Sequence, residues 1–218
     1  MNIVFDLESI GATDPAIIER IGANIRPPGN YKKAESIEKW IAEEKPAAVE
    51  EALLKTAFDG TYGKIVCIGF AVDDKPPHTF CGDDEKYIIT SFYQAVQDAR
   101  QTPHCGPLVM VGHNLVGFDL KFLWKRSVIL GIRPPMVIPF KAKPWDATVY
   151  DTLVEWDKDN RTSLDNICAV LGIPSPKGEL DGSKVWEYFK AGRYDEIATY
   201  CAGDVNATRE VYRRMTFS

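Results

Sequence analysis

The stretch that decides the fold is Ile-Val-Phe-Asp-Leu-Glu at residues 3–8 of this 218-residue chain. Its apolar residues predict a short buried strand over residues 2–7. Residues two apart in a strand point to the same face, so Asp6 and Glu8 project together from the end of this strand. One face of the predicted sheet therefore carries two negative charges.

A third acid lies in the last segment of the chain, where residues 194–215 have helical periodicity. At ~100° per residue, Asp204 falls inside the apolar arc that also contains Ile197 and Cys201. Tyr200 lies one turn before Asp204, on the same side. A carboxylate in an apolar arc costs several kcal/mol unless it is paired or binds a metal, so the pattern predicts a nearby cation.

The fourth acid is Asp119, which begins a predicted helix over residues 117–130. Apolar residues share its side of that helix, so Asp119 is also predicted to be buried. Arg126 shares the same arc, which makes an ion pair between Arg126 and Asp119 the alternative explanation for that acid.

Composition limits the class of protein. The chain is 45% hydrophobic and 26% charged, which is most simply a single globular domain over residues 1–218. No segment approaches the ~20 apolar residues that span a bilayer, and no secretory leader is evident. We therefore expect a cytoplasmic protein that does not enter a membrane.

Five scattered cysteines without a Cys-x-x-Cys spacing suit a reducing compartment: Cys67, Cys81, Cys105, Cys168 and Cys201. A zinc site built from His78, Cys81, His104 and Cys105 is the alternative, but their spacing matches no common zinc site. We interpret these residues as loop residues and small core thiols.

The net charge of −5 argues against extensive nonspecific binding of duplex nucleic acid. It leaves room for a small site that acts on a strand end. Four clustered carboxylates contribute much of the excess charge, and two divalent cations would reverse it locally.

Strands and helices are predicted in an order that gives a mixed sheet flanked by helices. The predicted strands cover residues 2–7, 63–72, 78–81, 108–111 and 148–153, and the later helices cover 84–101, 117–130, 163–171, 183–190 and 194–215. Ser163 and Ser183 are the expected N-caps of two of these helices.

Residues 12–61 do not fit this sheet and are predicted to form a helical insertion after the first strand. Two amphipathic helices are expected, over 36–44 and 47–58, separated by Pro46. Their many Lys and Glu residues are interpreted as a solvated face.

The acidic patches together carry a family resemblance. Asp-x-Glu on the first strand, Asn-x-x-x-Phe-Asp before a helix and Tyr-x-x-x-Asp on the last helix resemble the three motifs of the DnaQ-like, or DEDD, 3′→5′ exonucleases. The tyrosine marks the DEDDy branch. Residues 64–72 and the C-terminal segment are most similar to predicted exonucleases related to the family B polymerase proofreading domain. The resemblance implies an α/β, ribonuclease H-like fold with a mixed five-stranded sheet.

The resemblance also implies a catalytic set. Asp6, Glu8, Asp119 and Asp204 would bind two Mg²⁺ or Mn²⁺ ions, with Asp6 bridging both. All-oxygen ligands agree with this, because they select hard cations. Tyr200 would orient the attacking water, since a phenol with a pKa near ~10 is a poor base at neutral pH.

Other residues would contact the 3′-terminal nucleotide, namely Ser9, Ile10, His113, Asn114, Phe118 and Lys177. For His113 a hydrogen bond to a loop carbonyl is an equal alternative, and for Phe118 an anchoring role at the helix start is favoured. Lys177 has a solvated loop lysine as its alternative. Asp151 is expected to cap or brace rather than to catalyse.

The predicted function is release of nucleoside 5′-monophosphates from the 3′ ends of DNA, with single strands favoured. An RNA 3′-exonuclease on the same fold is the nearer alternative, because the discrimination of the 2′-hydroxyl depends on pocket shape. A noncatalytic nucleic-acid-binding module is the further one. The sequence does not indicate whether the protein has a protein partner.

Overall fold

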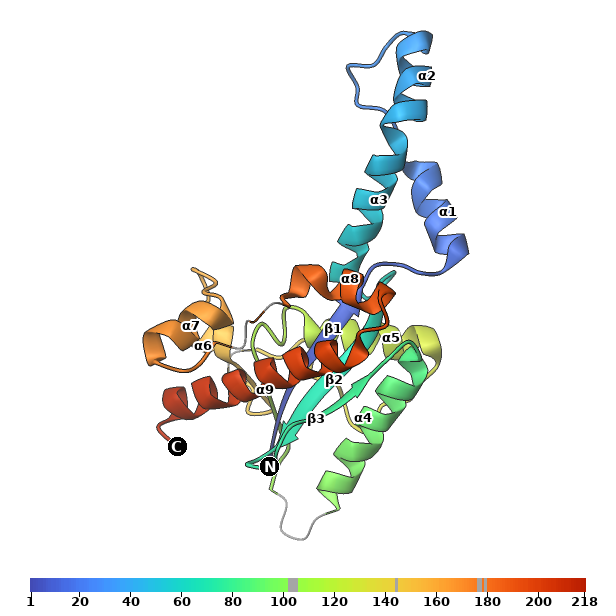
Figure 1. The fold of residues 1–218 in the computed structure, drawn as a ribbon. Helices are drawn as coiled ribbons and strands as arrows, with labels where there is room; N and C mark the ends of the chain where they lie inside the picture. Colours follow the sequence, from blue (N-terminus) through green and yellow to red (C-terminus); the bar gives the residue numbers. More distant parts are fainter. Residues whose placement is uncertain (102–105, 144, 176–177, 179) are drawn as a thin grey trace.

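The computed structural model describes residues 1–101, 106–143, 145–175, 178 and 180–218. Its centre is a mixed five-stranded sheet in the order β3-β2-β1-β4-β5 (Figure 1). The strands are β1 (Asn2–Ile10), β2 (Lys64–Val72), β3 (His78–Cys81), β4 (Val109–Gly112) and β5 (Val149–Asp151). β1 runs antiparallel to β2 and parallel to β4, and β4 runs parallel to β5. The predicted mixed sheet is confirmed.

The alternation of side chains along β1 separates the two layers of helices. Phe5 and its odd-numbered neighbours pack in the core with α4 (Glu85–Arg100) and α5 (Asp119–Leu130). Val4 points to the other face and packs against Val205 of α9 (Tyr194–Thr216). Asp6 and Glu8 lie two and four residues after Val4, so their side chains point to the same face of the sheet, the face that α9 covers.

The insertion between β1 and β2 forms a helical arm that projects away from the sheet (Figure 1). It contains α1 (Pro15–Asn24), α2 (Ala34–Glu43), α3 (Lys45–Lys55) and the 3₁₀ turn η1 (Thr56–Phe58). Helix α1 was not predicted, although Asp14 caps it and Pro15 begins it. Pro46 does not separate two helices but lies in the first turn of α3, where a missing N–H costs nothing.

The segment after β4 differs most from the sequence-based expectation. The predicted strand over 148–153 is wrong in its second half, because the chain turns at Asp151 into α6 (Thr152–Asp157). The Asp151 carboxylate accepts the main-chain N–H of Leu153 at 3.2 Å and so caps this helix. A local cap outweighs the β-branched composition of the segment.

The two predicted N-caps had different outcomes. Ser163 caps α7 (Leu164–Leu171), where its hydroxyl accepts the N–H of Asn166 at 3.3 Å. Ser183 is not a cap. It lies inside the 3₁₀ turn η2 (Gly182–Lys184), which precedes α8 (Val185–Lys190) and is capped by the side chain of Asp181.

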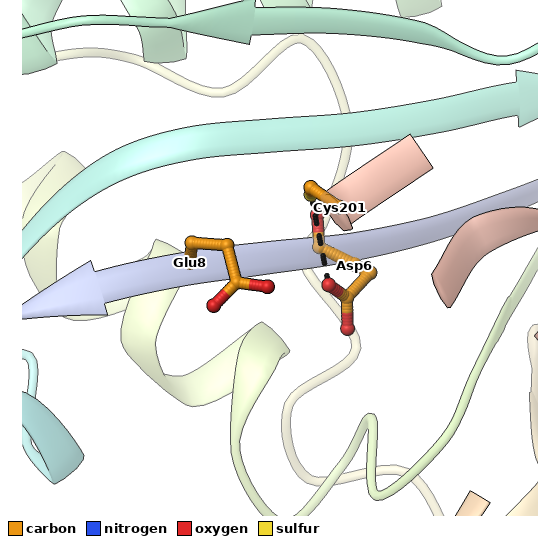
Figure 2. Close-up of side chains that lie close together, drawn as sticks. All are labelled: Asp6, Glu8 and Cys201. Atoms are coloured by element: carbon orange, nitrogen blue, oxygen red, sulfur yellow. Dashed lines mark hydrogen bonds between the residues drawn. The ribbon is translucent and has the colours of Figure 1, made fainter. Parts of the chain in front are cut away.

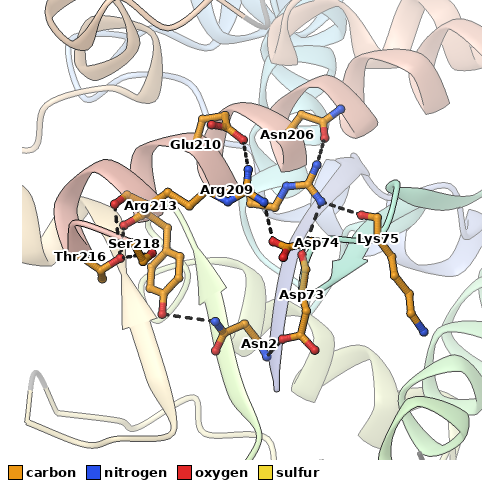
Figure 3. Close-up of polar contacts among 11 residues, drawn as sticks. Asn2, Asp73, Asp74, Lys75, Asn206, Arg209, Glu210, Arg213, Thr216 and Ser218 are labelled. Atoms are coloured by element: carbon orange, nitrogen blue, oxygen red, sulfur yellow. Dashed lines mark hydrogen bonds and ion pairs between the residues drawn. The ribbon is translucent and has the colours of Figure 1, made fainter.

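Helix α9 is fixed across the sheet by polar contacts at its C-terminal half (Figure 3). Arg209 donates to the carbonyl of Lys75 at 2.6 Å, and Arg213 pairs with Asp74 at 2.5 Å. The turn after β2 therefore holds the helix that carries Asp204. With 23 residues α9 is the longest described helix, but neither it nor any other described helix is long and apolar enough to cross a membrane.

Candidate active site

Asp6 and Glu8 form the base of the site. Figure 2 shows their carboxylates extending from the same side of β1, as the alternation along a strand predicts. Glu8 is 7% exposed, and Asp6 is half-buried. Ligand atoms of Asp6, Glu8 and Cys201 all lie within 4.8 Å of one another, which is close enough for one cation to contact all three.

Asp119 joins this pair from the other layer of helices. It is the first residue of α5, is 3% exposed, and accepts the main-chain N–H of Leu7 at 3.2 Å. The alternative ion pair with Arg126 is wrong. Arg126 lies two turns further along α5 and instead forms a forked pair with Glu85 of α4, at 2.7 and 2.8 Å. Because Arg126 pairs with Glu85, the Asp119 carboxylate can serve as a ligand in the site.

Helix α9 supplies Asp204 and Tyr200, one turn apart. The Tyr200 hydroxyl interacts with Asp204, and this interaction contributes to its electrostatics. Burial, followed by the charges of Glu8, Asp204 and Asp6, raises the pKa of Tyr200 well above its ordinary value. Tyr200 is therefore a hydrogen-bond donor at neutral pH.

The electrostatics show that the four acids act on one another. Burial raises the pKa of Asp6 well above its usual range, and repulsion from Cys201, Glu8, Asp119 and Asp204 adds to the rise. The pKa of Glu8 rises for the same reasons, first burial and then the charges of Asp204 and Asp119. Burial also raises the pKa of Asp119, although the N–H donors around it oppose the rise. Charge that repels itself at close range is relieved by a bound cation.

This donor set fits hard divalent ions. Within the described ranges, Asp6, Glu8 and Asp119 have no Lys or Arg at ion-pair distance. Four carboxylates offer only oxygen ligands, which Mg²⁺ and Mn²⁺ prefer. The four carboxylates could therefore hold such cations.

Cys201 is a neighbour of the site that the sequence interpretation missed. It was taken as a small core thiol, and it is indeed buried. Its Sγ, however, lies 3.6 Å from Oδ2 of Asp6. Gly69 permits this approach of α9, because a Cβ at that position would lie 2.8 Å from the Cys201 sulfur. The signal available in the sequence was that Cys201 and Asp204 share one arc of the last helix.

The other cysteines match the interpretation as far as the described residues extend. Cys67 and Cys168 are buried and Cys81 is partly buried, all as free thiols. His78 and Cys81 belong to β3, whereas His104 and Cys105 lie outside the described residues.

Asp151 braces the loop between β4 and α5, as predicted. Its carboxylate accepts the N–H groups of Asn114 at 2.9 Å and of Val116 at 3.0 Å. Asn114 has a φ of 59°, in the left-handed region that a short polar side chain tolerates. The Asn114 amide oxygen accepts a hydrogen bond from Arg161 at 3.0 Å. Its predicted contact with a nucleotide stays a prediction.

His113 contacts the side chain of Thr152, and the main chain of Thr162 in the following loop also interacts with its imidazole. Nδ1 lies 3.0 Å from the Thr152 hydroxyl, which in turn donates to the carbonyl of Gly112 at 3.2 Å. Nε2 is buried and lacks a well-formed hydrogen bond in the described part of the chain. Burial lowers the pKa of His113 to about 4, with only partial opposition from the main chain of Thr162.

The remaining predicted contact residues lie at different depths. Ser9 is partly buried and donates to the carbonyl of Ala57 at 2.7 Å. Ile10 is fully buried, so any contact with a nucleotide would have to come from its main chain. Phe118 precedes α5 and packs on Phe122 with ring centroids 5.5 Å apart, which agrees with an anchoring role. Lys177 lies outside the described residues.

Comparison with known proteins identifies the family and the fold of the chain. A sequence family described as predicted 3′-5′ exonucleases related to the exonuclease domain of PolB matches residues 62–218. No curated protein sequence matches the chain. Among solved structures, the family B DNA polymerase from the hyperthermophilic archaeon Pyrobaculum calidifontis is similar, with a TM-score of 0.62 and 18% sequence identity.

That similarity covers 99% of this chain and 24% of the polymerase chain, so the protein spans about a quarter of the polymerase it resembles. At this identity the likeness establishes the fold, and it confirms the predicted ribonuclease H-like sheet. The family match covers the second and third acidic patches, in β4–α5 and α9. The chain therefore belongs to the family of predicted 3′-5′ exonucleases related to the exonuclease domain of PolB.

Proposed function

We propose that the protein is a two-metal 3′→5′ exonuclease of the DEDDy type that releases nucleoside 5′-monophosphates from the 3′ ends of DNA. The observation that carries the proposal is the convergence of Asp6, Glu8, Asp119 and Asp204 beside Tyr200: burial and the charges of neighbouring acids raise the pKa values of Asp6, Glu8 and Asp119. Structural ion pairing does not account for Asp6, Glu8 or Asp119 in the described part of the chain.

In this proposal Asp6 would contribute to the binding of both ions, Glu8 and Asp204 would help to hold the first, and Asp119 would hold the second from the end of α5. When bound, Mg²⁺ or Mn²⁺ ions would supply an activated water and charge stabilisation for the departing 3′ oxygen. The main-chain N–H of Leu7 fixes the Asp119 carboxylate.

Tyr200 positions the attacking water. Its raised pKa keeps the hydroxyl protonated, so it donates a hydrogen bond and does not accept the proton of the water. Loss of one such positioning bond typically costs on the order of 10- to 1000-fold in turnover.

The proposed substrate is a single-stranded or frayed 3′ end, with the whole chain, arm included, acting as one exonuclease domain. A net charge of −5 limits the number of phosphate contacts that the protein offers. Few phosphate contacts cannot offset the cost of unpairing a duplex end, so an already unpaired end is favoured.

Digestion of end-labelled oligonucleotides tests the proposal. DNA carrying a 5′ label should be shortened from its 3′ end with Mg²⁺ or Mn²⁺, and the reaction should stop in EDTA. Ca²⁺ should bind but support little turnover, because its looser geometry positions the reacting groups poorly. A 3′-phosphate should block the reaction.

Parallel reactions with RNA separate the alternatives. Faster digestion of RNA than of DNA would reassign the substrate while leaving the mechanism in place. Digestion that persists in EDTA, or that starts from the 5′ end, would refute the mechanism. Binding of oligonucleotides without digestion of either one would instead indicate a noncatalytic module.

A further inference from the structure

Beside the site, α8 carries aromatic rings that are covered by cations. The Lys190 ammonium group lies 5.2 Å from the ring centroid of Trp186, and that of Lys64 lies 5.6 Å from the centroid of Phe189. The rings of Trp186 and Phe189 lie nearly parallel, 6.2 Å apart and inclined by 13°. We call these four residues the α8 surface.

The α8 surface borders a hollow of about 310 Å³ between α8 and the root of the arm. Figure 1 shows α8 beside the lower end of α3. The walls of the hollow include Trp186 and Lys190 of α8, Leu53 and Leu54 of α3, and the main chain at Gly11. This volume is at the lower end of small-molecule sites in proteins, about 300–1,000 Å³, and suits a planar ring system.

The hollow continues the proposed site along β1. Gly11 follows Glu8 by three residues, or roughly 10 Å of extended chain. Lys64 pairs with Ile10 in the sheet register, which places the other side of the α8 surface at the same end of the strand. A strand whose 3′ end lay at Glu8 would reach this surface within one or two nucleotides.

The charges on this surface favour a polyanion. Neither Lys64 nor Lys190 has a carboxylate at ion-pair distance within the residues that the structure describes. Glu50 also lines the hollow, so the two lysines leave this surface with a net positive charge in a chain whose net charge is −5. Aromatic rings together with lysines are the combination that binds single-stranded nucleic acid without sequence preference.

We propose that the α8 surface and the hollow bind the single-stranded segment next to the 3′ end, with one nucleobase in the hollow and Lys64 and Lys190 on its phosphates. This inference rests on the proposed function. The arm wall of the hollow, from Ile18 to Leu54, lies outside the residues 62–218 that match the family, so the hollow combines residues inside and outside the matched range.

Binding without hydrolysis tests the inference independently of catalysis. The probe is a 5′-fluorescein thymidine oligonucleotide of about 12 nucleotides, titrated in EDTA by fluorescence anisotropy at several salt concentrations. Trp186→Ala should weaken binding about 5- to 150-fold, the scale for loss of one base–aromatic contact. Trp186→Phe should retain most of the affinity, because a planar ring remains.

The lysines are tested by salt dependence. Lys64→Gln and Lys190→Gln should each lower the slope of log Kd against log salt concentration by about 0.7, the value for one phosphate contact on a single strand. Lys39→Gln, an exposed lysine of α2, and Trp156→Ala, a half-exposed tryptophan of α6, are matched controls and should bind as the parent does.

A second substrate separates the two proposals. Thymidine 5′-monophosphate p-nitrophenyl ester has no preceding strand, so Trp186→Ala and Lys190→Gln should hydrolyse it at the parental rate while their KM for the oligonucleotide rises. A parent that hydrolyses neither substrate contradicts the proposed function, and the binding data still decide this inference. Parental salt slopes in both lysine variants would overturn it, as would parental affinity in Trp186→Ala.

Discussion

Asp6→Asn tests whether the clustered acids serve a cation or the fold. Asn has nearly the same shape as Asp, and its amide oxygen can still accept the contact from Cys201 that Asp6 receives at 3.6 Å. The substitution therefore removes a charge and little else. If the acids are arranged for metals, the metal-free variant should be at least as stable as the metal-free parent, although it should be inactive.

The size of the effect follows from the geometry. Ligand oxygens of Asp6 and Glu8 lie within 4.8 Å. At that separation and an effective dielectric constant of about 20, two like charges repel by about 3 kcal/mol. For a chain of this length, 1 kcal/mol moves the melting temperature by about 2–4 °C, so the variant should gain up to about 10 °C in EDTA. This is an upper bound, because a proton bound by the parent relieves part of the repulsion.

The gain should depend on pH in a defined direction. Burial and then neighbouring negative charge raise the pKa of Asp6 in the folded chain. An acid with a raised folded pKa costs no stability below its unfolded pKa of about 3.9, and the cost grows as the pH rises toward the folded pKa. The difference between variant and parent should therefore be larger at pH 8 than at pH 5.

Thermal melts of parent and Asp6→Asn, in EDTA and in Mn²⁺, give the measurement. Mn²⁺ at 100 times its Kd should stabilise the parent by about 2.7 kcal/mol and the variant by less. Asp204→Asn is the parallel variant from the other side of the site. A variant that melts clearly lower than the parent in EDTA would show that the acid stabilises the fold, and the inference of a metal site from buried charge would fail.

Three further predictions follow from individual contacts. Tyr200→Phe should keep the Mn²⁺-dependent rise in melting temperature while turnover falls about 10- to 1000-fold; full activity would remove Tyr200 from the mechanism. Glu85→Gln should lower the free energy of unfolding in urea by about 3–5 kcal/mol, because it leaves the charged Arg126 without its partner in a largely buried position. The control Lys125→Ala breaks a half-exposed ion pair and should lower it by about 1 kcal/mol or less. The His113 imidazole should stay neutral in NMR titrations down to about pH 4, and its contribution to stability should decline as the pH falls from 6.5 toward that value; a midpoint near 6.5 would contradict its burial.

Periodicity made much of this protein predictable from its sequence. The two-residue period of β1 is a local property of the backbone, so the shared face of Asp6 and Glu8 followed from spacing alone. The helical period likewise placed Tyr200 one turn from Asp204. The order of strands and helices predicted the mixed sheet, and the composition of residues 12–61 predicted an insertion outside it.

What only the tertiary structure decided were the partners that come from different elements. Arg126 could be assigned to Asp119 on one helical wheel, but the packing of α4 against α5 gives it Glu85 instead. Cys201 reaches Asp6 because Gly69 lets α9 approach the sheet closely. The hollow beside α8 exists because the arm begins where β1 ends. Periodicity fixes the direction of a side chain within its own element, whereas its partner depends on how closely and at what angle another element packs against it, and that is set by the side chains of the whole interface.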